Sequence, residues 1–370
     1  MSNSLGQFFR ITSFGESHGR CVGVALDGCP AGLRLREEDV QKELDRRKPA
    51  QSPLTTSRAE ADRVEILSGV FNGFTTGAPI CMLVWNQSAD SAEYEKYRWT
   101  PRPGHADYPA YVKYGGFNDY RGGGRFSGRI TASYVMAGVV AKRLLLEQLN
   151  VEVLAHTCGV GGIQAKESSV EEIKRNTEGN PVRCADVDAA EKMAAAIQKA
   201  AAEGDSLGGV VECVVLNLPA GVGGPVFDTL EGDLAKALFA IPAVKAVGFG
   251  LGSSFSALMG SQSNDAYALR HERVVTETNR AGGIVGGMSS GMPIICRVTF
   301  KATPSIRKRQ RTIDLASMKE TVLEVGGQHD PCIVPRAVPV VEAMVAVVLV
   351  DHALRAGLIP LVLGGRTNGV

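Results

Sequence analysis

Four arginines, a histidine and a serine hydroxyl lie close together in this sequence, in the segments Arg102–Asp107 (RPGHAD) and Arg121–Arg129 (RGGGRFSGR). The planar guanidinium of arginine matches the oxygens of phosphate and carboxylate groups. Glycine lets the backbone come close to a ligand, and a histidine beside arginines carries a proton near neutral pH. We therefore predict a pocket for a multiply charged anion that contains an acid–base group.

Three further segments carry polar groups next to predicted secondary structure. Ser17 and His18 lie between two glycines at the end of a predicted strand, residues 8–14. Residues 301–305 (KATPS) follow a predicted strand and offer one ammonium and two hydroxyls, which suit a phosphate group. Residues 326–330 (GGQHD) precede an apolar helix. An ordinary hairpin, in which Ser17 and His18 bond the local backbone, is the alternative for the first segment.

Among the histidines, His18 and His105 have neighbours that suit anion chemistry. His329 adjoins Asp330 and could orient a site without reacting. The others are expected to be structural or exposed: His156, His271 and His352. Because no histidine pair has helical i, i+4 spacing and no Cys-x-x-Cys pair occurs, we expect no metal site.

Predicted helices and strands alternate without an obvious linker, so we expect one α/β domain over residues 1–370, with mixed or antiparallel sheets packed on central helices. A helix over residues 130–149 begins apolar all round, which indicates a buried start. Its N-terminus would face the glycine loop and favour an anion there. The other predicted elements are helices at 36–47, 188–203, 225–239 and 338–355 and strands at 21–26, 64–70, 79–85, 209–216 and 294–300.

Composition limits the classes of protein. The 370 residues are 44% hydrophobic with a formal net charge of +1, which favours a well-buried core and argues against a dedicated nucleic-acid binder. The eight cysteines are scattered, the first residues lack a signal-peptide pattern, and the longest apolar run, 343–350, is far shorter than the roughly 20 residues of a membrane span. We expect a cytoplasmic protein that binds no membrane.

Two functions fit these residues. One is an enzyme that acts on a phosphorylated or carboxylated metabolite, with histidine and aspartate transferring protons. The other is a protein that binds nucleotide or RNA through its Arg-Gly-Gly cluster. RNA binding usually adds exposed aromatic residues among the basic ones, and aromatics make up only 6% of this chain. The enzyme is favoured, but residue types and spacing leave its reaction open.

Several motifs carry a family resemblance. Residues 15–19 (GESHG) with 27–30 (DGCP), residues 124–131 (GRFSGRIT), and residues 329–332 (HDPC) with 336–339 (RAVP) resemble the three signatures of the chorismate synthase family. The resemblance extends from about residue 6 to residue 357. It implies a sandwich with central helices between mainly antiparallel sheets, assembled as a homotetramer. It also implies a lyase that eliminates phosphate from 5-enolpyruvylshikimate 3-phosphate in the anti-1,4 sense. The cofactor would be reduced FMN, with NADPH as a possible reductant.

The resemblance also implies roles for single residues. His18 would protonate the departing phosphate, His105 would serve the reduced flavin, and Asp330 would help to remove the ring proton. The substrate's anionic groups would be held by Arg47, Arg102 and Arg129, with Ser17 and Ser127 in support. The implied flavin contacts are Arg125, Phe126, Ser127, Ala243, Gly286, Lys301, Ala302, Thr303, Pro304, Ser305 and Gln328.

The chain departs from the family pattern at a few positions. Pro53 and Gln328 stand where many members carry arginine. Arg58 could compensate for the first change, and Gln328 could still hydrogen-bond the flavin but would supply no charge. Phe126 and Ile130 replace a serine and a glutamate that are common elsewhere.

Overall fold

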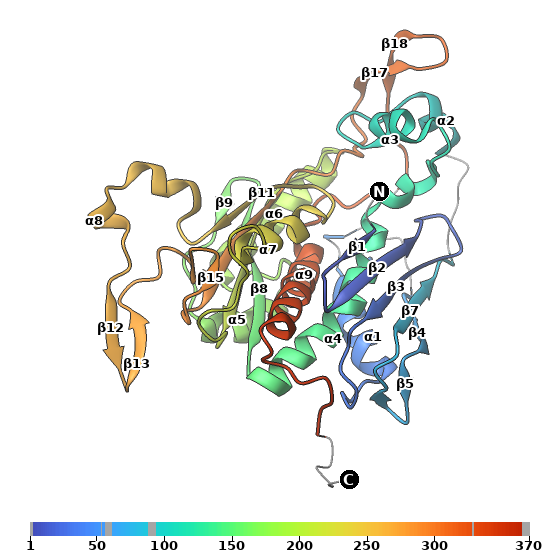
Figure 1. Cartoon of the computed structure of the whole chain (residues 1–370). Coiled ribbons are helices and arrows are strands. Elements are labelled where there is room, and N and C mark those ends of the chain that lie inside the picture. The colour runs from blue at the N-terminus through green and yellow to red at the C-terminus, as the bar shows by residue number, and fades with distance from the viewer. Residues whose placement is uncertain (1–2, 53, 56–60, 88–93, 328, 365–370) are drawn as a thin grey trace.

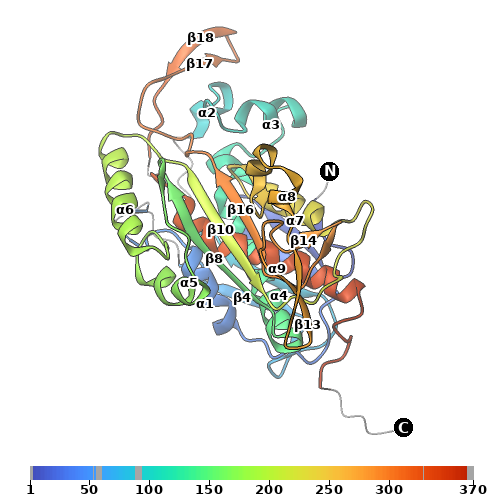
Figure 2. The ribbon, with the colours of Figure 1, turned by 90° about the vertical axis from the view of Figure 1, so that its left-hand side faces the viewer.

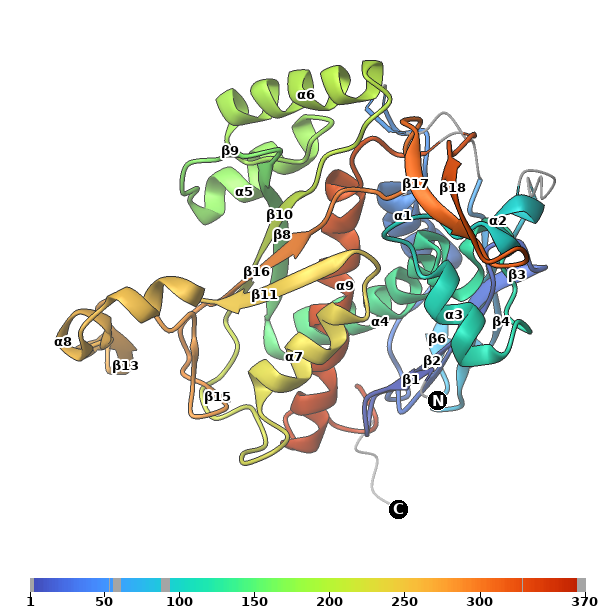
Figure 3. The same ribbon diagram turned by 90° about the horizontal axis from the view of Figure 1, so that it is seen from above.

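A computed structural model describes residues 3–52, 54–55, 61–87, 94–327 and 329–364, so Pro53, Arg58 and Gln328 lie outside the described residues. Two antiparallel five-stranded sheets enclose a layer of helices dominated by α4 and α9 (Figures 1 and 3). The predicted fold class, central helices between mainly antiparallel sheets, is confirmed. Buried residues of both sheets and of these helices form one contiguous hydrophobic cluster.

The first sheet has the strand order β1-β2-β3-β7-β4. Alternate residues of β3 (Cys21–Asp27), namely Val22, Val24 and Leu26, are fully buried, as expected of a strand with one face on the core. The remaining strands are β1 (Ser4–Leu5), β2 (Arg10–Gly15), β4 (Val64–Ser68) and β7 (Ile80–Trp85). The small β5 (Val70–Phe71) and β6 (Phe74–Thr75) pair beside this sheet. The strands predicted in this region are therefore confirmed, with shifts of one or two residues at their ends.

The second sheet has the order β11-β16-β10-β8-β9. Its strands are β8 (Glu152–Val160), β9 (Ile163–Gln164), β10 (Gly209–Leu216), β11 (Val244–Phe249) and β16 (Ile294–Phe300). On its outer face α5 (Val170–Asn176), followed by the short η4 (Thr177–Gly179), packs Ile173 against Val214. The alanine-rich α6 (Val187–Ala202) runs along the β8–β9 edge (Figure 2) and begins where Asp186 accepts a hydrogen bond from the Ala189 backbone N–H.

The central helices are α1 (Glu37–Arg47), α4 (Thr131–Leu149), α7 (Leu230–Phe239) and α9 (Val334–Arg355). Helix α9 starts four residues before the predicted position because Pro335 is compatible with a first helical turn. Among the described residues α9 alone is long and apolar enough to cross a membrane, but the whole of its apolar window is buried within the protein, as in a core helix. The predicted helix over 225–239 is wrong at its start, since Thr229 caps α7 and residues 225–229 precede it.

A buried charge cluster lies where α1, α4 and α9 meet. The Glu342 carboxylate receives hydrogen bonds from Arg46 (2.6 Å) and Lys142 (3.0 Å). Burial alone would raise the pKa of Glu342, but these two cations outweigh it and lower that pKa to about 2. Glu342 is therefore ionised and paired at neutral pH, which satisfies the charge that α9 carries into the core.

A layer of smaller elements covers one end of the sandwich. It contains α2 (Glu95–Trp99), α3 (Asp107–Tyr114) and the hairpin of β17 (Gln310–Asp314) with β18 (Lys319–Leu323), at the top of Figure 1. Tyr97 of α2 packs with Leu323 and Val325 in a small separate core. An arm extends from another edge and contains η5 (Gly252–Ala257), α8 (Gly260–Ser263) and the hairpin of β12 (Tyr267–Arg270) with β13 (Arg273–Thr276). The hairpin of β14 (Ile284–Val285) and β15 (Met288–Ser289) follows it.

The close packing of α4 on α9 gives a first prediction. A Cβ added at Gly138 would lie 2.3 Å from the Ala343 Cβ, too close for two carbons. Alanine is normally the better helix former, but overpacking reverses that gain. We expect Gly138→Ala to lower the free energy of unfolding by about 1–3 kcal/mol, measured by urea denaturation. The double variant Gly138→Ala/Ala343→Gly should recover little of this loss, because the backbone Cα of residue 343 would still lie 2.5 Å from the new Cβ. An unchanged free energy of unfolding in the single variant would contradict the close contact.

Candidate active site

A cavity of about 760 Å³ opens where the N-terminal ends of α4 and α9 approach the layer of α2 and α3. This size is typical of small-molecule sites. Of the residues predicted to form a site, those that line it are Ser17, Arg47, Arg102, His105, Arg125, Phe126, Ser127, Arg129, Ala243, Lys301, Thr303, Pro304, Ser305 and Asp330. The structure thus brings together segments that are far apart in the sequence.

Some predicted site residues lie elsewhere. His18 is buried behind the cavity wall, and Ala302 does not line the cavity although its neighbours do. Gly286 lies in the turn between β14 and β15, away from the cavity. Gln328 lies outside the described residues.

The triple-glycine loop separates the two candidate histidines. It lies in η2 (Arg121–Phe126), and Gly122, Gly123 and Gly124 have φ of 58°, 81° and 51°, in the left-handed region that favours glycine. A Cβ on Gly122 would lie 2.5 Å from His18 Nε2 and 2.8 Å from Ser17 Oγ, and a Cβ on Gly123 would lie 3.1 Å from His105 Nε2. These glycines therefore let both rings approach one short stretch of backbone.

Ser17 and His18 lie at the turn of the β2–β3 hairpin, as the sequence predicted. Both are buried, and the His18 ring contacts Tyr94 edge-on with 4.9 Å between ring centroids. Ser17 lines the cavity directly. The hairpin is present, and it places the Ser17 hydroxyl in the cavity wall with the His18 imidazole buried next to it.

Two arginines share one buried carboxylate that sequence reasoning missed. Arg47, at the end of α1, donates to Asp62 Oδ2 (3.0 Å), while Arg129, in η3 (Gly128–Ile130), pairs with Asp62 Oδ1. The Asp62 side chain is fully buried. Burial would raise the pKa of Asp62, but Arg47 and Arg129 lower it below its ordinary value. Asp62 therefore stays ionised and holds the two guanidiniums side by side.

Each arginine also has neutral anchors. The Arg47 guanidinium donates to Thr131 Oγ1 (3.1 Å) and to the Gly128 carbonyl (2.7 Å), and Arg129 Nε donates to Asn86 Oδ1 (2.9 Å). An arginine side chain loses rotamer freedom when it binds a ligand, and these partners already restrict that freedom in the unliganded protein. The pair is therefore positioned before any anion arrives.

A third arginine, Arg336, completes this side of the cavity and was not predicted. Its guanidinium pairs with Asp330 and donates from Nε to the Arg47 carbonyl (3.0 Å). It lies in the first turn of α9, and Lys245 lines the cavity from β11. Sequence reasoning found Asp330 but gave no signal that Arg336 would turn towards it.

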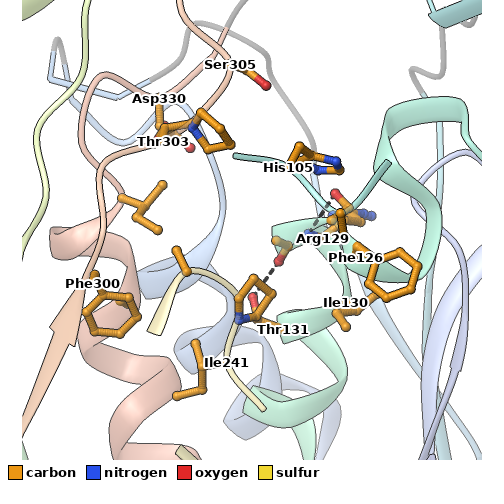
Figure 4. Close-up of a pocket in the computed structure, with 18 of the residues that line it drawn as sticks. His105, Phe126, Arg129, Ile130, Thr131, Ile241, Phe300, Thr303, Ser305 and Asp330 are labelled. Carbon is orange, nitrogen blue, oxygen red and sulfur yellow. Dashed lines mark hydrogen bonds between the residues drawn. The ribbon is translucent and has the colours of Figure 1, made fainter. Parts of the chain in front are cut away.

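Apolar side chains form the opposite wall. Figure 4 shows Phe300 and Ile241 on the side away from Arg129 and Phe126. Lys301, Thr303 and Ser305 follow Phe300 at the rim. The Thr303 hydroxyl is buried and has no hydrogen-bond partner among the described residues, so it is available to a ligand. The cavity thus has an apolar wall bordered by hydroxyls and cations.

A family profile described as chorismate synthase matches residues 9–354 of this chain. The chain belongs to the chorismate synthase family. The resemblance predicted from the sequence motifs is therefore confirmed, and the chain is a member of an enzyme family.

Similar family members cover the whole chain. The chorismate synthase of Dehalococcoides mccartyi is 57% identical over 363 residues, covering 98% of this chain and 100% of that protein. That of Methanocella arvoryzae is 56% identical over 366 residues, covering 99% and 98%. A crystal structure of chorismate synthase superposes with a TM-score of 0.74 at 29% identity, covering 97% of this chain and 94% of that one.

The glycine loop gives a second prediction. We expect Gly122→Ala to lower chorismate formation at least tenfold, because the new methyl would displace His18, and strain in the left-handed region adds about 1–2 kcal/mol. Gly123→Ala should have a smaller effect, since its contact with His105 is looser. Gly252→Ala is the matched control, because Gly252 has a similar φ of 55°, an added Cβ would meet nothing within 4 Å, and the residue does not line the cavity. Equal turnover in all three variants would contradict the spacing role of the loop.

Asp62 gives a third prediction. In Asp62→Asn the two guanidiniums lose their shared charge partner, so we expect the dissociation constant of a phosphorylated ligand to rise about tenfold, measured by calorimetry. The free energy of unfolding should fall by about 3–5 kcal/mol, as when a buried ion pair is broken. Asp45→Asn, which removes an exposed pair with Lys48 (2.8 Å), is the control and should change neither quantity appreciably. Unchanged ligand affinity in Asp62→Asn would refute the positioning of the arginines.

Proposed function

We propose that this enzyme eliminates phosphate from 5-enolpyruvylshikimate 3-phosphate to form chorismate, with reduced FMN as cofactor. The observation that carries the proposal is the single cavity in which Arg47, Arg129 and Arg336 face an apolar wall, with two histidines at the glycine loop. The substrate carries one phosphate and two carboxylates, so a cationic surface of this extent matches its charge. Family membership supports the same reaction.

The residues present fit a flavin nucleotide. Phe300 and Ile241 offer an apolar face for a planar ring system. The buried Thr303 hydroxyl, with Lys301 and Ser305, would hold a terminal phosphate at the rim. When bound, reduced FMN supplies a transient source of electrons for a reaction that has no net oxidation.

Proton movements fall to the chain's own side chains. Asp330 would accept the ring proton on a carboxylate oxygen, and its pairing with Arg336 keeps that carboxylate oriented. His18 Nε2 and Ser17 Oγ lie on the same side of Gly122, within 2.8 Å of the position that a Cβ there would occupy. His18 would therefore supply the proton for the departing phosphate through Ser17, which lines the cavity. Neutralising the leaving group in this way lowers the barrier to its departure.

A second copy of the chain accounts for Gly286. Gly286 does not line the cavity, so a flavin contact at Gly286 would come from a neighbouring subunit. The family resemblance implies a homotetramer, and we propose that assembly and a cytoplasmic location for this chain. NADPH is the proposed physiological reductant of the flavin.

The direct test is an anaerobic assay with 5-enolpyruvylshikimate 3-phosphate and photoreduced FMN. Chorismate formation, followed by its ultraviolet absorbance, would support the reaction. No turnover, with RNA bound instead, would overturn it. Repeating the assay in air with NADPH tests the proposed reductant separately.

The histidines give a fourth prediction. His18→Ala and His105→Ala should each reduce turnover by about two to four orders of magnitude, as loss of an acid–base group does. The control is His271→Asn, an exposed histidine with φ 49° that asparagine tolerates, and it should keep wild-type turnover. Turnover within threefold of wild type in either alanine variant would remove that histidine from the mechanism.

A further inference from the structure

Asp107 makes more contacts with the site than its place in the sequence suggests. It is the first residue of α3, and its side chain is almost fully buried. Its Oδ1 lies 2.6 Å from His105 Nδ1 and accepts from Arg102 Nη2 (2.9 Å). Its Oδ2 accepts from Arg102 Nε (2.8 Å) and from the Arg102 backbone N–H (3.0 Å). One carboxylate thus fixes both an arginine and a histidine.

An ionised carboxylate can only accept hydrogen bonds. Burial would raise the pKa of Asp107, but its hydrogen bonds from Arg102 and His105 hold that pKa well below its ordinary value. Asp107 is therefore ionised at neutral pH, and the short contact requires a proton on His105 Nδ1. Arg102 Nη2 lies 3.1 Å from Nδ1 and 3.4 Å from Nε2, nearly equidistant, so it selects neither nitrogen.

The other ring nitrogen, Nε2, does not contact Asp107. His105 itself lines the cavity, so Nε2 is the ring nitrogen that a ligand there can engage. We propose that Asp107 is a positioning residue that fixes His105 in its Nδ1–H form, so that Nε2 is the nitrogen that exchanges a proton with a ligand in the cavity. The inference rests on the proposed function only for its kinetic consequence.

Three charged groups face His105. Burial lowers its pKa below the ordinary value, the hydrogen bond to Asp107 opposes this, and Arg102 and Lys301 lower it further. The ring is thus neutral near pH 7, with Nε2 unprotonated and able to accept. An anionic ligand at Nε2 would favour the protonated ring. His105 would then take up its proton when the anion binds.

The test is ¹⁵N NMR of the protein with labelled histidine, without substrate or flavin. The His105 signals are assigned by their loss in His105→Gln. At pH 7.5 the wild type should show a protonated Nδ1 and an unprotonated Nε2. Asp107→Asn should give a mixture of both tautomers and a lower His105 pKa, because the carboxylate that raises it is gone. Asp107→Glu should restore the Nδ1–H form at least in part.

The matched control is Asp119→Asn, which removes another Asp–Arg pair (2.8 Å to Arg121) near the glycine loop without touching His105, and its His105 spectrum should equal that of the wild type. An Nε2–H ring in the wild type, or an unchanged tautomer in Asp107→Asn, would overturn the proposal. The wild-type spectrum decides the first point even if Asp107→Asn does not fold.

Kinetics provide an independent outcome. Asp107→Asn should lower turnover about 10- to 100-fold and shift the acid limb of its pH profile to lower pH, with KM for the phosphorylated substrate within threefold of wild type. An unchanged pH profile would contradict the positioning role. If the wild type shows the Nδ1–H form yet forms no chorismate, the proposed function fails and the assignment of Asp107 stands.

Discussion

The site depends on pairing four of the arginines that line the cavity with carboxylates. Asp62 holds Arg47 and Arg129, Asp107 holds Arg102, and Asp330 pairs with Arg336. Guanidiniums gathered in one cavity repel one another and lose hydration, at a cost of several kcal/mol for each unpaired buried charge. The carboxylates remove most of that cost and set each guanidinium's direction. The cations can therefore face an anion without rearranging when it binds.

The fold brings these pairs together because it is built on close helix contacts. Gly138 allows α4 to lie directly on Ala343 of α9, which places the starts of both helices at the same end of the sandwich. Arg129 precedes α4, and Arg336 lies in the first turn of α9. The triple-glycine loop then closes the distance between His18 and His105. Packing in the core and chemistry at the cavity thus depend on the same helices.

Elements with a regular pattern of apolar residues could be predicted from the sequence. The alternation in Val22, Val24 and Leu26 predicts a strand with one buried face, and the apolar run that follows Arg129 predicts a buried helix start. The arginine and glycine types indicated an anion site, and the family resemblance implied roles for fourteen of the residues that line the cavity.

The sequence did not reveal contacts between side chains that are far apart in the chain and meet only in the folded structure. Asp62 lies in a stretch with other carboxylates, Glu60 and Glu65, and nothing near it in sequence shows that it will lie between Arg47 and Arg129. The sequence predicted a helix from residue 225, but Thr229 caps α7 and the helix begins after it. The composition of this segment did not show which threonine would act as a cap. The family resemblance implied a flavin contact at Gly286, yet the fold of one chain places Gly286 away from the cavity.

We propose that one cavity holds two anionic ligands, the flavin on the Phe300 wall and the substrate on the arginines that Asp62 joins. The most direct measurement is a crystal structure of the protein with FMN and 5-enolpyruvylshikimate 3-phosphate. We predict the flavin ring against Phe300 and Ile241, its phosphate at Thr303, and substrate oxygens within hydrogen-bonding distance of Arg47 and Arg129. A substrate bound elsewhere, or a flavin phosphate on the Arg47–Arg129 pair, would contradict this account.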